Sequence, residues 1–171
     1  MKQFYDYNRE AAVDYAKKWA LGRNPAYKDY ENLGGDCTNY ISQSIHAGGI
    51  PFDHNGEEYK KWYWYSDASR TPSWTSAELL HLYIMSNNNK YSQNHGIYAR
   101  SANYNELELG DLVQLIYNGK AYHTMIVTDI ILEGEYVLDY LVCQHTYDLL
   151  DYPLSMKVGE RRYIKILGYY K

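Results

Sequence analysis

Residues 112–145 have the sequence LVQLIYNGKAYHTMIVTDIILEGEYVLDYLVCQH, and this stretch decides the class of fold. It contains runs rich in β-branched and aromatic residues, which favour strands. Asn118-Gly119 and the turn around Gly134 separate these runs and are typical of β-hairpins. With one more run near the C-terminus, the predicted strands are 112–117, 122–132, 136–145 and 163–169. The second half of the chain therefore predicts a meander of antiparallel strands.

The first half shows helical spacing instead. Ala12, Tyr15, Ala16 and Trp19 share one face of a predicted helix over 8–21, which Gly22 ends. A second helix is predicted over 36–47, because Gly48-Gly49 and Pro51 follow it as stop signals. A third should begin near Thr75, where Thr75–Glu78 fits a capping box, and should end at 86–89. Residues 54–71 lack a steady period, and 61–65 are interpreted as a loop or a short strand.

Helices first and antiparallel strands afterwards predict an α+β fold, with N-terminal helices packed on a C-terminal antiparallel sheet. The length of 171 residues predicts one domain spanning 1–171. Tyrosine is unusually frequent, with 22 residues against 2 phenylalanines. Because each tyrosine hydroxyl needs a polar partner, we expect a core with many polar edges and a large aromatic groove.

Charge and composition exclude several classes of function. A net charge of -4 without a basic stripe disfavours nucleic acid as a partner. No run of about 20 apolar residues suggests a membrane span, and the N-terminal residues lack the apolar stretch of a secretory signal. The 2 cysteines, Cys37 and Cys143, do not form a disulfide framework or a four-ligand zinc set. No His-Glu-x-x-His pattern is present, so we expect no metal and no cofactor.

The segment Gly34-Gly35-Asp36-Cys37 is the first candidate for chemistry. A cysteine in the first turn of a helix lies where free N–H groups and the helix dipole stabilise a thiolate, the nucleophilic form. The two glycines would let the backbone approach a ligand closely. The alternative is that Cys37 is a small buried core residue, as free cysteines usually are. A base near Cys37 would decide between the two interpretations.

Two of the 6 histidines qualify as that base or its partner. His123 opens a predicted strand, and His145 closes the next one at the same sequence distance from Gly134. The two could therefore be cross-strand neighbours, with His145 accepting the second N–H of His123 as the third group of a catalytic triad. Gln144 and Asp148 are rivals for this third role, and alternation puts Gln144 on the face opposite His145. The other histidines lie on helices or in polar loops; they are His46, His54, His81 and His95.

Together these motifs resemble a known superfamily. The segments 36–41 and 110–113, followed by His123 and His145, look like the NlpC/P60 and CHAP superfamily of papain-like cysteine peptidases and amidases. More closely, the chain resembles the putative amidase domain of that clan, which is found in Gram-positive bacteria. The segments that carry this likeness are 7–13, 19–20, 24–25, 34–39, 47–49, 73–75 and 144–146. The resemblance implies a papain-like fold, with Cys37 as nucleophile, His123 as base and His145 as the polar third residue.

The implied reaction is cysteine-dependent hydrolysis of an amide through a thioester. Its partner would be a peptide or amide substrate, and in related enzymes this is the peptide stem of peptidoglycan. The oxyanion would be held by the Cys37 amide and a second donor, either the Tyr30 hydroxyl or a side chain near Asp36. Trp74, with Trp62 and Trp64, would suit a groove that packs sugars or D-amino acids, although such rings are often core residues. The family resemblance implies a secreted or cell-wall protein.

Two other functions remain open at this stage. An acyl transferase that passes the thioester to an amine would use the same residues. A cell-wall glycan-binding module with an aromatic groove would leave Cys37 inert. Selective, histidine-dependent labelling of Cys37 would favour an enzyme over a binding module.

Overall fold

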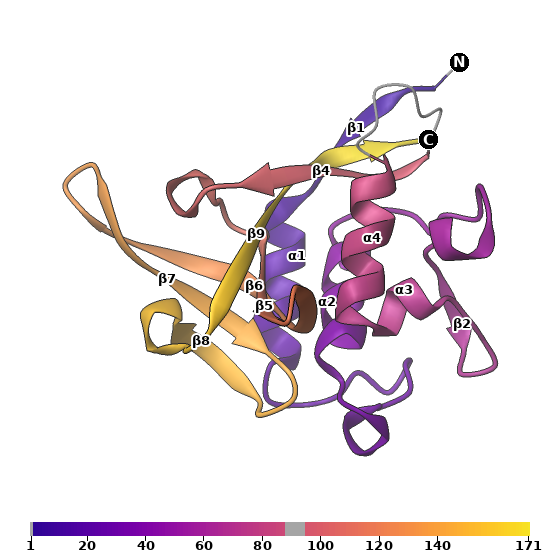
Figure 1. Ribbon diagram of the computed structural model, residues 1–171, viewed down its shortest axis with the longest axis horizontal. Helices are drawn as coiled ribbons and strands as arrows, with labels where there is room; N and C mark the ends of the chain where they lie inside the picture. Colours follow the sequence, from indigo (N-terminus) through magenta and orange to yellow (C-terminus); the bar gives the residue numbers. More distant parts are fainter. Residues whose placement is uncertain (1, 88–94) are drawn as a thin grey trace.

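The computed structural model describes residues 2–87 and 95–171, and these have the predicted α+β architecture (Figure 1). The helices are α1 (Arg9–Trp19), α2 (Cys37–Ala47), α3 (Pro72–Thr75) and α4 (Ala77–Asn87), with short 3-10 turns η1 (Glu31–Leu33), η2 (Glu58–Lys60), η3 (Tyr104–Glu106) and η4 (Leu154–Met156). The strands are β1 (Phe4–Asp6), β2 (Trp64–Ser66), β3 (Ser69–Arg70), β4 (Gly96–Ala102), β5 (Leu112–Tyr117), β6 (Lys120–Glu133), β7 (Tyr136–Gln144), β8 (Leu149–Pro153) and β9 (Glu160–Tyr170).

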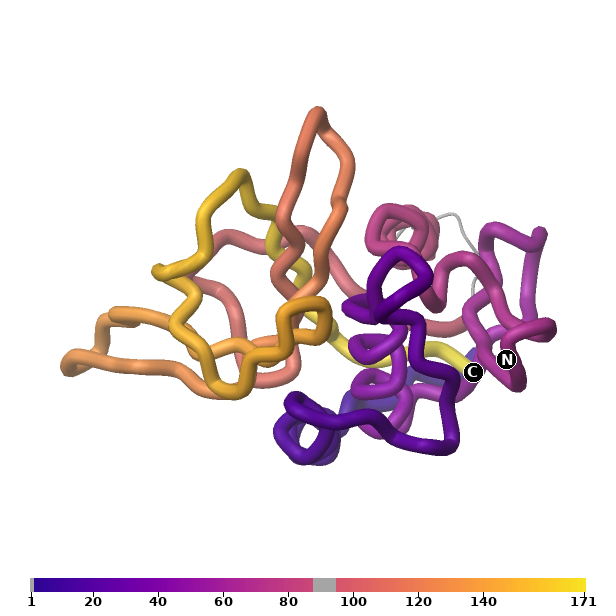
Figure 2. Tube along the Cα trace, turned by 90° about the horizontal axis from the view of Figure 1, so that it is seen from below, coloured from indigo at the N-terminus to yellow at the C-terminus, as the bar shows by residue number. Residues whose placement is uncertain are grey.

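A curled antiparallel sheet forms one side of the molecule. Its strands follow the order β1-β9-β5-β6-β7-β8, and β4 also pairs with β9, while β2 and β3 form a separate two-stranded sheet. Figure 2 shows the helices gathered on one side of the molecule and the long hairpins of the sheet projecting from the other. Helices and strands thus form two layers, as the sequence predicts.

Strand β9 brings the two ends of the chain together. Phe4 of β1 pairs with Tyr170 of β9. One step further out, the backbones of Gln3 and Lys171 exchange two hydrogen bonds of 3.0 and 3.1 Å. The ends of the described chain therefore lie side by side on one antiparallel pair (Figure 1).

The sheet has a hydrophobic core on each face. The core against the helices includes Tyr40, Ile45, Leu80, Ile126 and Cys143, and the core on the other face includes Val113, Met125, Val127, Val142 and Leu154. Because side chains alternate along a strand, the odd-numbered positions of this part of β6 face away from the helices. His123 therefore shares a face with Met125, and Thr124 faces the helices.

The first two helices follow the sequence prediction closely. Asn8 caps α1, since its side-chain oxygen accepts a hydrogen bond from the Ala11 amide at 3.0 Å. Helix α2 packs against α1, and the Tyr40 hydroxyl donates to the Ala16 carbonyl at 2.6 Å. This contact shows how a tyrosine-rich core can satisfy its hydroxyls internally.

Helix α4 begins differently from the prediction. Thr75 ends the short helix α3, and Ser76 is extended, so the predicted capping box at Thr75 is wrong. Glu78 instead accepts from the Ala121 amide at 2.7 Å and pairs with Arg162 at 3.1 Å. The local cap comes from Ser76, whose hydroxyl accepts a hydrogen bond from the Leu79 amide at 3.4 Å. Helix α4 runs to Asn87, and the rest of the predicted helix end, 88–89, lies outside the described residues.

The pairing of β6 with β7 corrects another prediction. Ile126 pairs with Cys143, and continuing this register by two residues puts Thr124, rather than His123, opposite His145. Register shifts between Val127 and Asp129 and again further along break the symmetry about the turn. Counting residues from the hairpin tip therefore gives the wrong cross-strand neighbour.

Candidate active site

Cys37 is the first residue of α2 and lies at the junction of that helix with β6. The next residue is Thr38, and its hydroxyl oxygen lies 3.3 Å from the Thr124 hydroxyl oxygen of β6. Burial raises the pKa of the Cys37 thiol, and hydrogen bonds from the Thr38 side chain and the Thr124 backbone only partly oppose the rise. In this conformation burial keeps the resting sulfur as a neutral thiol instead of the predicted thiolate.

Asp36 anchors the residues just before the helix. Its Oδ1 accepts hydrogen bonds from the Tyr30 amide and the Asn39 side chain, both at 2.9 Å. Its Oδ2 lies 2.5 Å from Nδ1 of His145 and 3.6 Å from Nε of Arg23. The carboxylate is buried, with 1% of the residue exposed, and is satisfied from several directions. It therefore fixes the entry to α2.

His145 belongs to this anchor. Its Nδ1 faces Asp36, its Nε2 lies 2.7 Å from the Trp19 carbonyl oxygen, and its ring stacks on Tyr40 at 4.0 Å between centroids. Since Nε2 must donate to a carbonyl and Nδ1 shares a proton with a carboxylate, no ring nitrogen can accept a hydrogen bond from His123. The predicted third-residue role of His145 is therefore not compatible with this geometry.

His123 is buried on the other face of β6, with 7% of the residue exposed. Its Nε2 has no hydrogen-bond partner within the described part of the chain. Burial lowers the pKa of the imidazole, a side-chain hydrogen bond with Gln144 opposes that shift, and the charge of Lys157 adds to it. No hydrogen bond joins His123 to Cys37, both of which are described. The residue after His123, Thr124, is the one whose backbone reaches the sulfur.

Of the three candidates for the third residue, Gln144 is the one beside His123. Asp148 forms two hydrogen bonds with the Arg23 guanidinium, at 2.8 and 3.1 Å, near Asp36. Gln144 shares the face of His123, because alternation from Val142 places it there. The sequence patterns make Gln144 a rival for the third role but favour the pair of His123 and His145.

The two predicted substrate-binding side chains lie elsewhere than in a groove. The Tyr30 hydroxyl donates to Asp67 at 3.0 Å and accepts from the Trp64 indole at 3.1 Å, so its proton is already committed. Trp74 has no exposed surface, and its indole donates to the Asn39 side chain at 2.9 Å. Both residues support helix α2 from inside the fold. Neither can contact a substrate in this conformation.

The glycine before Asp36 gives a testable result. Gly34 and Gly35 both have φ of +110°, but a Cβ on Gly35 would lie 3.0 Å from the Thr146 hydroxyl, whereas one on Gly34 would meet nothing within 4 Å. The Thr146 hydroxyl accepts a hydrogen bond from the Asp36 amide at 2.9 Å. Gly34→Ala should cost about 1 kcal/mol of unfolding free energy from backbone strain alone. Gly35→Ala should cost about 1 kcal/mol more, because it also disturbs this contact. Urea denaturation measures the difference, and equal losses would contradict it.

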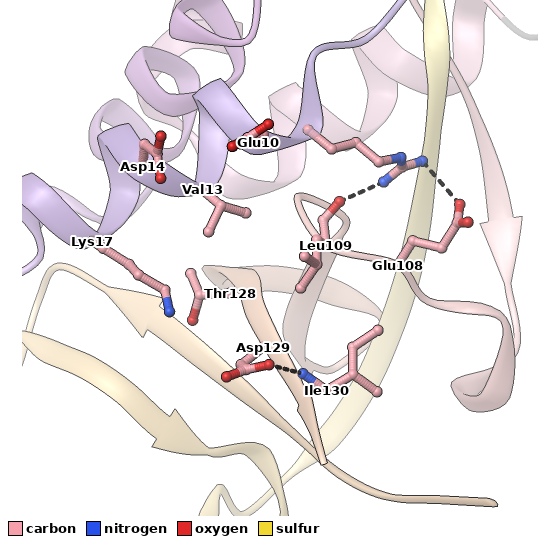
Figure 3. A pocket seen from close by; sticks show the side chains of 10 residues that line it. Glu10, Val13, Asp14, Lys17, Glu108, Leu109, Thr128, Asp129 and Ile130 are labelled. Carbon is pink, nitrogen blue, oxygen red and sulfur yellow. Dashed lines mark hydrogen bonds and ion pairs between the residues drawn. The ribbon is translucent and has the colours of Figure 1, made fainter. Parts of the chain in front are cut away.

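A separate groove of about 760 Å³ lies between α1 and the sheet (Figure 3). Figure 3 shows Lys17 of α1 extending toward Thr128 and Asp129 of β6, with Val13 and Leu109 nearby. Cys37, His123 and Gln144 are absent from its lining. The groove is therefore distinct from the candidate active site.

The described residues contain no group of three or more histidine, cysteine or acidic side chains arranged to hold a metal ion. No helix among them has the length and apolar character needed to cross a membrane.

Almost the whole sequence matches one family. The sequence profile of the putative amidase domain covers residues 6–167. The chain belongs to this family. Two relatives from Bacillus subtilis (strain 168) are similar to it, both described as uncharacterized proteins. YhbB is 35% identical over 72% of this chain and 37% of its own length, and YjcM is 30% identical over 92% of this chain and 36% of its own length.

The chain thus spans little more than a third of the length of these two relatives. No solved structure matches it significantly. Membership of the amidase family supports a hydrolase that acts on amide bonds. The family description does not specify the catalytic residues, so their roles depend on the geometry around Cys37.

Sequence reasoning missed part of this site. Lys157 donates to the Gln144 side chain at 2.8 Å, yet it lies in an irregular segment after η4 with no recognisable motif. In the sequence Asp36 is only a neighbour of the cysteine, because its pairing with His145 spans 109 positions. Only the folded chain brings these groups together.

Proposed function

We propose that the protein is a cysteine amidase or peptidase in which Cys37 is the nucleophile, His123 the base and Gln144 the polar third residue. One observation carries the proposal: Nε2 of His123 is buried without a partner, next to the strand residue that reaches the Cys37 sulfur. Family membership supplies the reaction class. The arrangement of a nucleophile helix against a histidine-bearing strand is also what supports a papain-like fold and a place in the NlpC/P60 and CHAP superfamily.

The first half of the reaction forms a thioester. Nε2 of His123 takes the thiol proton while Sγ of Cys37 attacks the amide carbonyl carbon. The oxyanion faces the Cys37 amide, which has no hydrogen-bond partner among the described residues and lies at the start of α2. The imidazolium then gives its proton to the departing amine nitrogen as the carbon–nitrogen bond breaks. A substrate must approach closely enough to displace side chains that now cover the sulfur.

The second half restores the enzyme. His123 removes a proton from water, the hydroxide attacks the thioester carbon, and the carbon–sulfur bond breaks. The thiolate recovers its proton from the imidazolium, and the carboxylic acid leaves. Because burial lowers the pKa of His123, the ring stays neutral, and so able to accept a proton, below its ordinary titration range.

The substrate proposal is a peptide amide, with peptidoglycan stems as the first class to test. It follows from the sequence resemblance to cell-wall amidases, and a secreted or cell-wall location follows from the same resemblance. An acyl transferase differs only in the acceptor of the thioester. The glycan-binding alternative loses its main support, because Trp62 and Trp74 are fully buried in the core.

Alkylation of the two cysteines tests the catalytic pair. At neutral pH, iodoacetamide should label Cys37 faster than Cys143, whose pKa is also raised by burial and which has no histidine in the proposed role. A His123→Ala variant should label Cys37 about tenfold or more slowly, since the base is lost. Mass spectrometry of the peptides measures both rates, and labelling in denaturant controls for access. Equal rates in wild type and variant would contradict the pair.

A further inference from the structure

Gln144 is held in one orientation by its own hairpin. Its Nε2 donates to the carbonyl oxygens of Thr146 and Tyr147 at 2.9 and 2.8 Å. Both of these residues have positive φ, +60° and +61°, a conformation that residues other than glycine rarely adopt. The strained turn thus brings two carbonyls within reach of one amide group. With its nitrogen so engaged, Gln144 must direct its side-chain oxygen the other way.

That oxygen meets Lys157. The Nζ of Lys157 donates to Oε1 of Gln144 at 2.8 Å, and the lysine side chain is half-buried, with its pKa lowered by desolvation. A carbonyl oxygen has two lone pairs, so the same atom can also accept the N–H of His123. Lys157, Gln144 and His123 then form one continuous chain of polar groups.

We propose that Lys157 is a positioning residue for the base: its ammonium group holds the Gln144 oxygen against His123. This inference rests on the proposed function. It makes the Gln144 amide a relay that is fixed at both ends, by the strained turn and by the lysine. The catalytic histidine is thereby kept neutral and correctly oriented before substrate arrives.

The surroundings of His123 support this assignment. Lys157 is the charged group whose field acts on the imidazole, and it lowers the histidine pKa. Apart from Lys157, the group that acts on the ring is the neutral Gln144 side chain, which forms a hydrogen bond with it. Arg161 of β9 directs its guanidinium at the carbonyl oxygens of Leu154 and Lys157. These contacts hold the segment that carries the lysine.

Titration of His123 by NMR tests the relay directly. Lys157→Met removes the charge and keeps a similar length, so the His123 titration midpoint should rise by about half a pH unit or more. Lys157→Arg keeps a charged donor and should stay close to wild type. Lys120→Met removes an exposed lysine from the start of β6, the strand that carries His123. It should leave the His123 titration midpoint unchanged. A His123→Gln variant assigns the resonance among the 6 histidines.

The pH dependence of Cys37 alkylation gives the second readout. The alkylation rate should fall on the acid side of its pH profile, because it depends on neutral His123. In Lys157→Met this acid limb should move to higher pH by the same amount as the His123 titration midpoint. An unchanged midpoint and an unchanged limb in a folded Lys157→Met protein would overturn the proposal. Neither readout requires turnover. A shifted midpoint without amide hydrolysis by the wild type would therefore contradict the proposed function alone. Hydrolysis by the wild type without a shifted midpoint in the variant would contradict the relay alone.

Discussion

Replacing Cys37 with alanine is expected to lower amide hydrolysis by about 10⁴-fold or more, because no thioester can form without the sulfur. The assay is digestion of muropeptides followed by mass spectrometry of the released peptides. Cys37 lies at a helix start with only 8% of its surface exposed, so alanine there should leave the fold intact. The loss should therefore appear in a protein with a normal circular dichroism spectrum.

Cys143 provides the matched control for this experiment. It is a buried cysteine of β7 whose sulfur interacts with Thr128, on the strand next to it. Cys143→Ala should reduce stability through the lost packing but keep turnover within about threefold of wild type once folded. Products that persist unchanged in Cys37→Ala would remove the nucleophile assignment. Products absent from wild type as well would point to another amide substrate.

The second large effect concerns stability. His145→Ala is expected to lower the free energy of unfolding by about 3–5 kcal/mol, because it leaves the Asp36 carboxylate buried without its main partner. The variant also loses the bond to the Trp19 carbonyl and the stacking on Tyr40. Urea denaturation followed by circular dichroism measures the change. The anchor before α2 would be the first part of the fold to loosen.

An exposed histidine serves as the comparison. His54 stacks on Tyr65 and lies 2.9 Å from its hydroxyl, but it faces solvent, so His54→Ala should cost less than about 1 kcal/mol. If His145→Ala were as stable as wild type and lost only turnover, His145 would be a catalytic third residue after all. The stability measurement thus separates an anchor from a member of the triad.

The sequence predicted the sheet well because alternating β-branched residues and Asn118-Gly119 act locally. Strand ends agree with the structure to within a few residues, as the match of the 136–145 prediction with β7 shows. Strand β4 was not predicted, because Ile97 and Ala99 are its only fully buried side chains. Their pairing with β9 depends on a partner about 70 positions away.

The site was harder to predict because it depends on register. Alternation correctly separated Gln144 from His145, but the face occupied by His123 could be known only from the pairing of Ile126 with Cys143. Bulges change that register without any clear mark in the sequence. The histidine pair therefore looked symmetric when it is not. The position of Trp74 was also hard to predict, because a tryptophan ring is as suitable for a buried core as for a substrate groove.

The meeting of the two chain ends on β1 and β9 has a mechanical consequence. Tension applied between the ends would pull Gln3 away from Lys171 across their hydrogen bonds, at right angles to the strands. The ladder would then open like a zipper, one rung after another, because the bonds are not loaded in parallel. Stretching should detach β1 at low force, while helix α2 stays packed on the sheet.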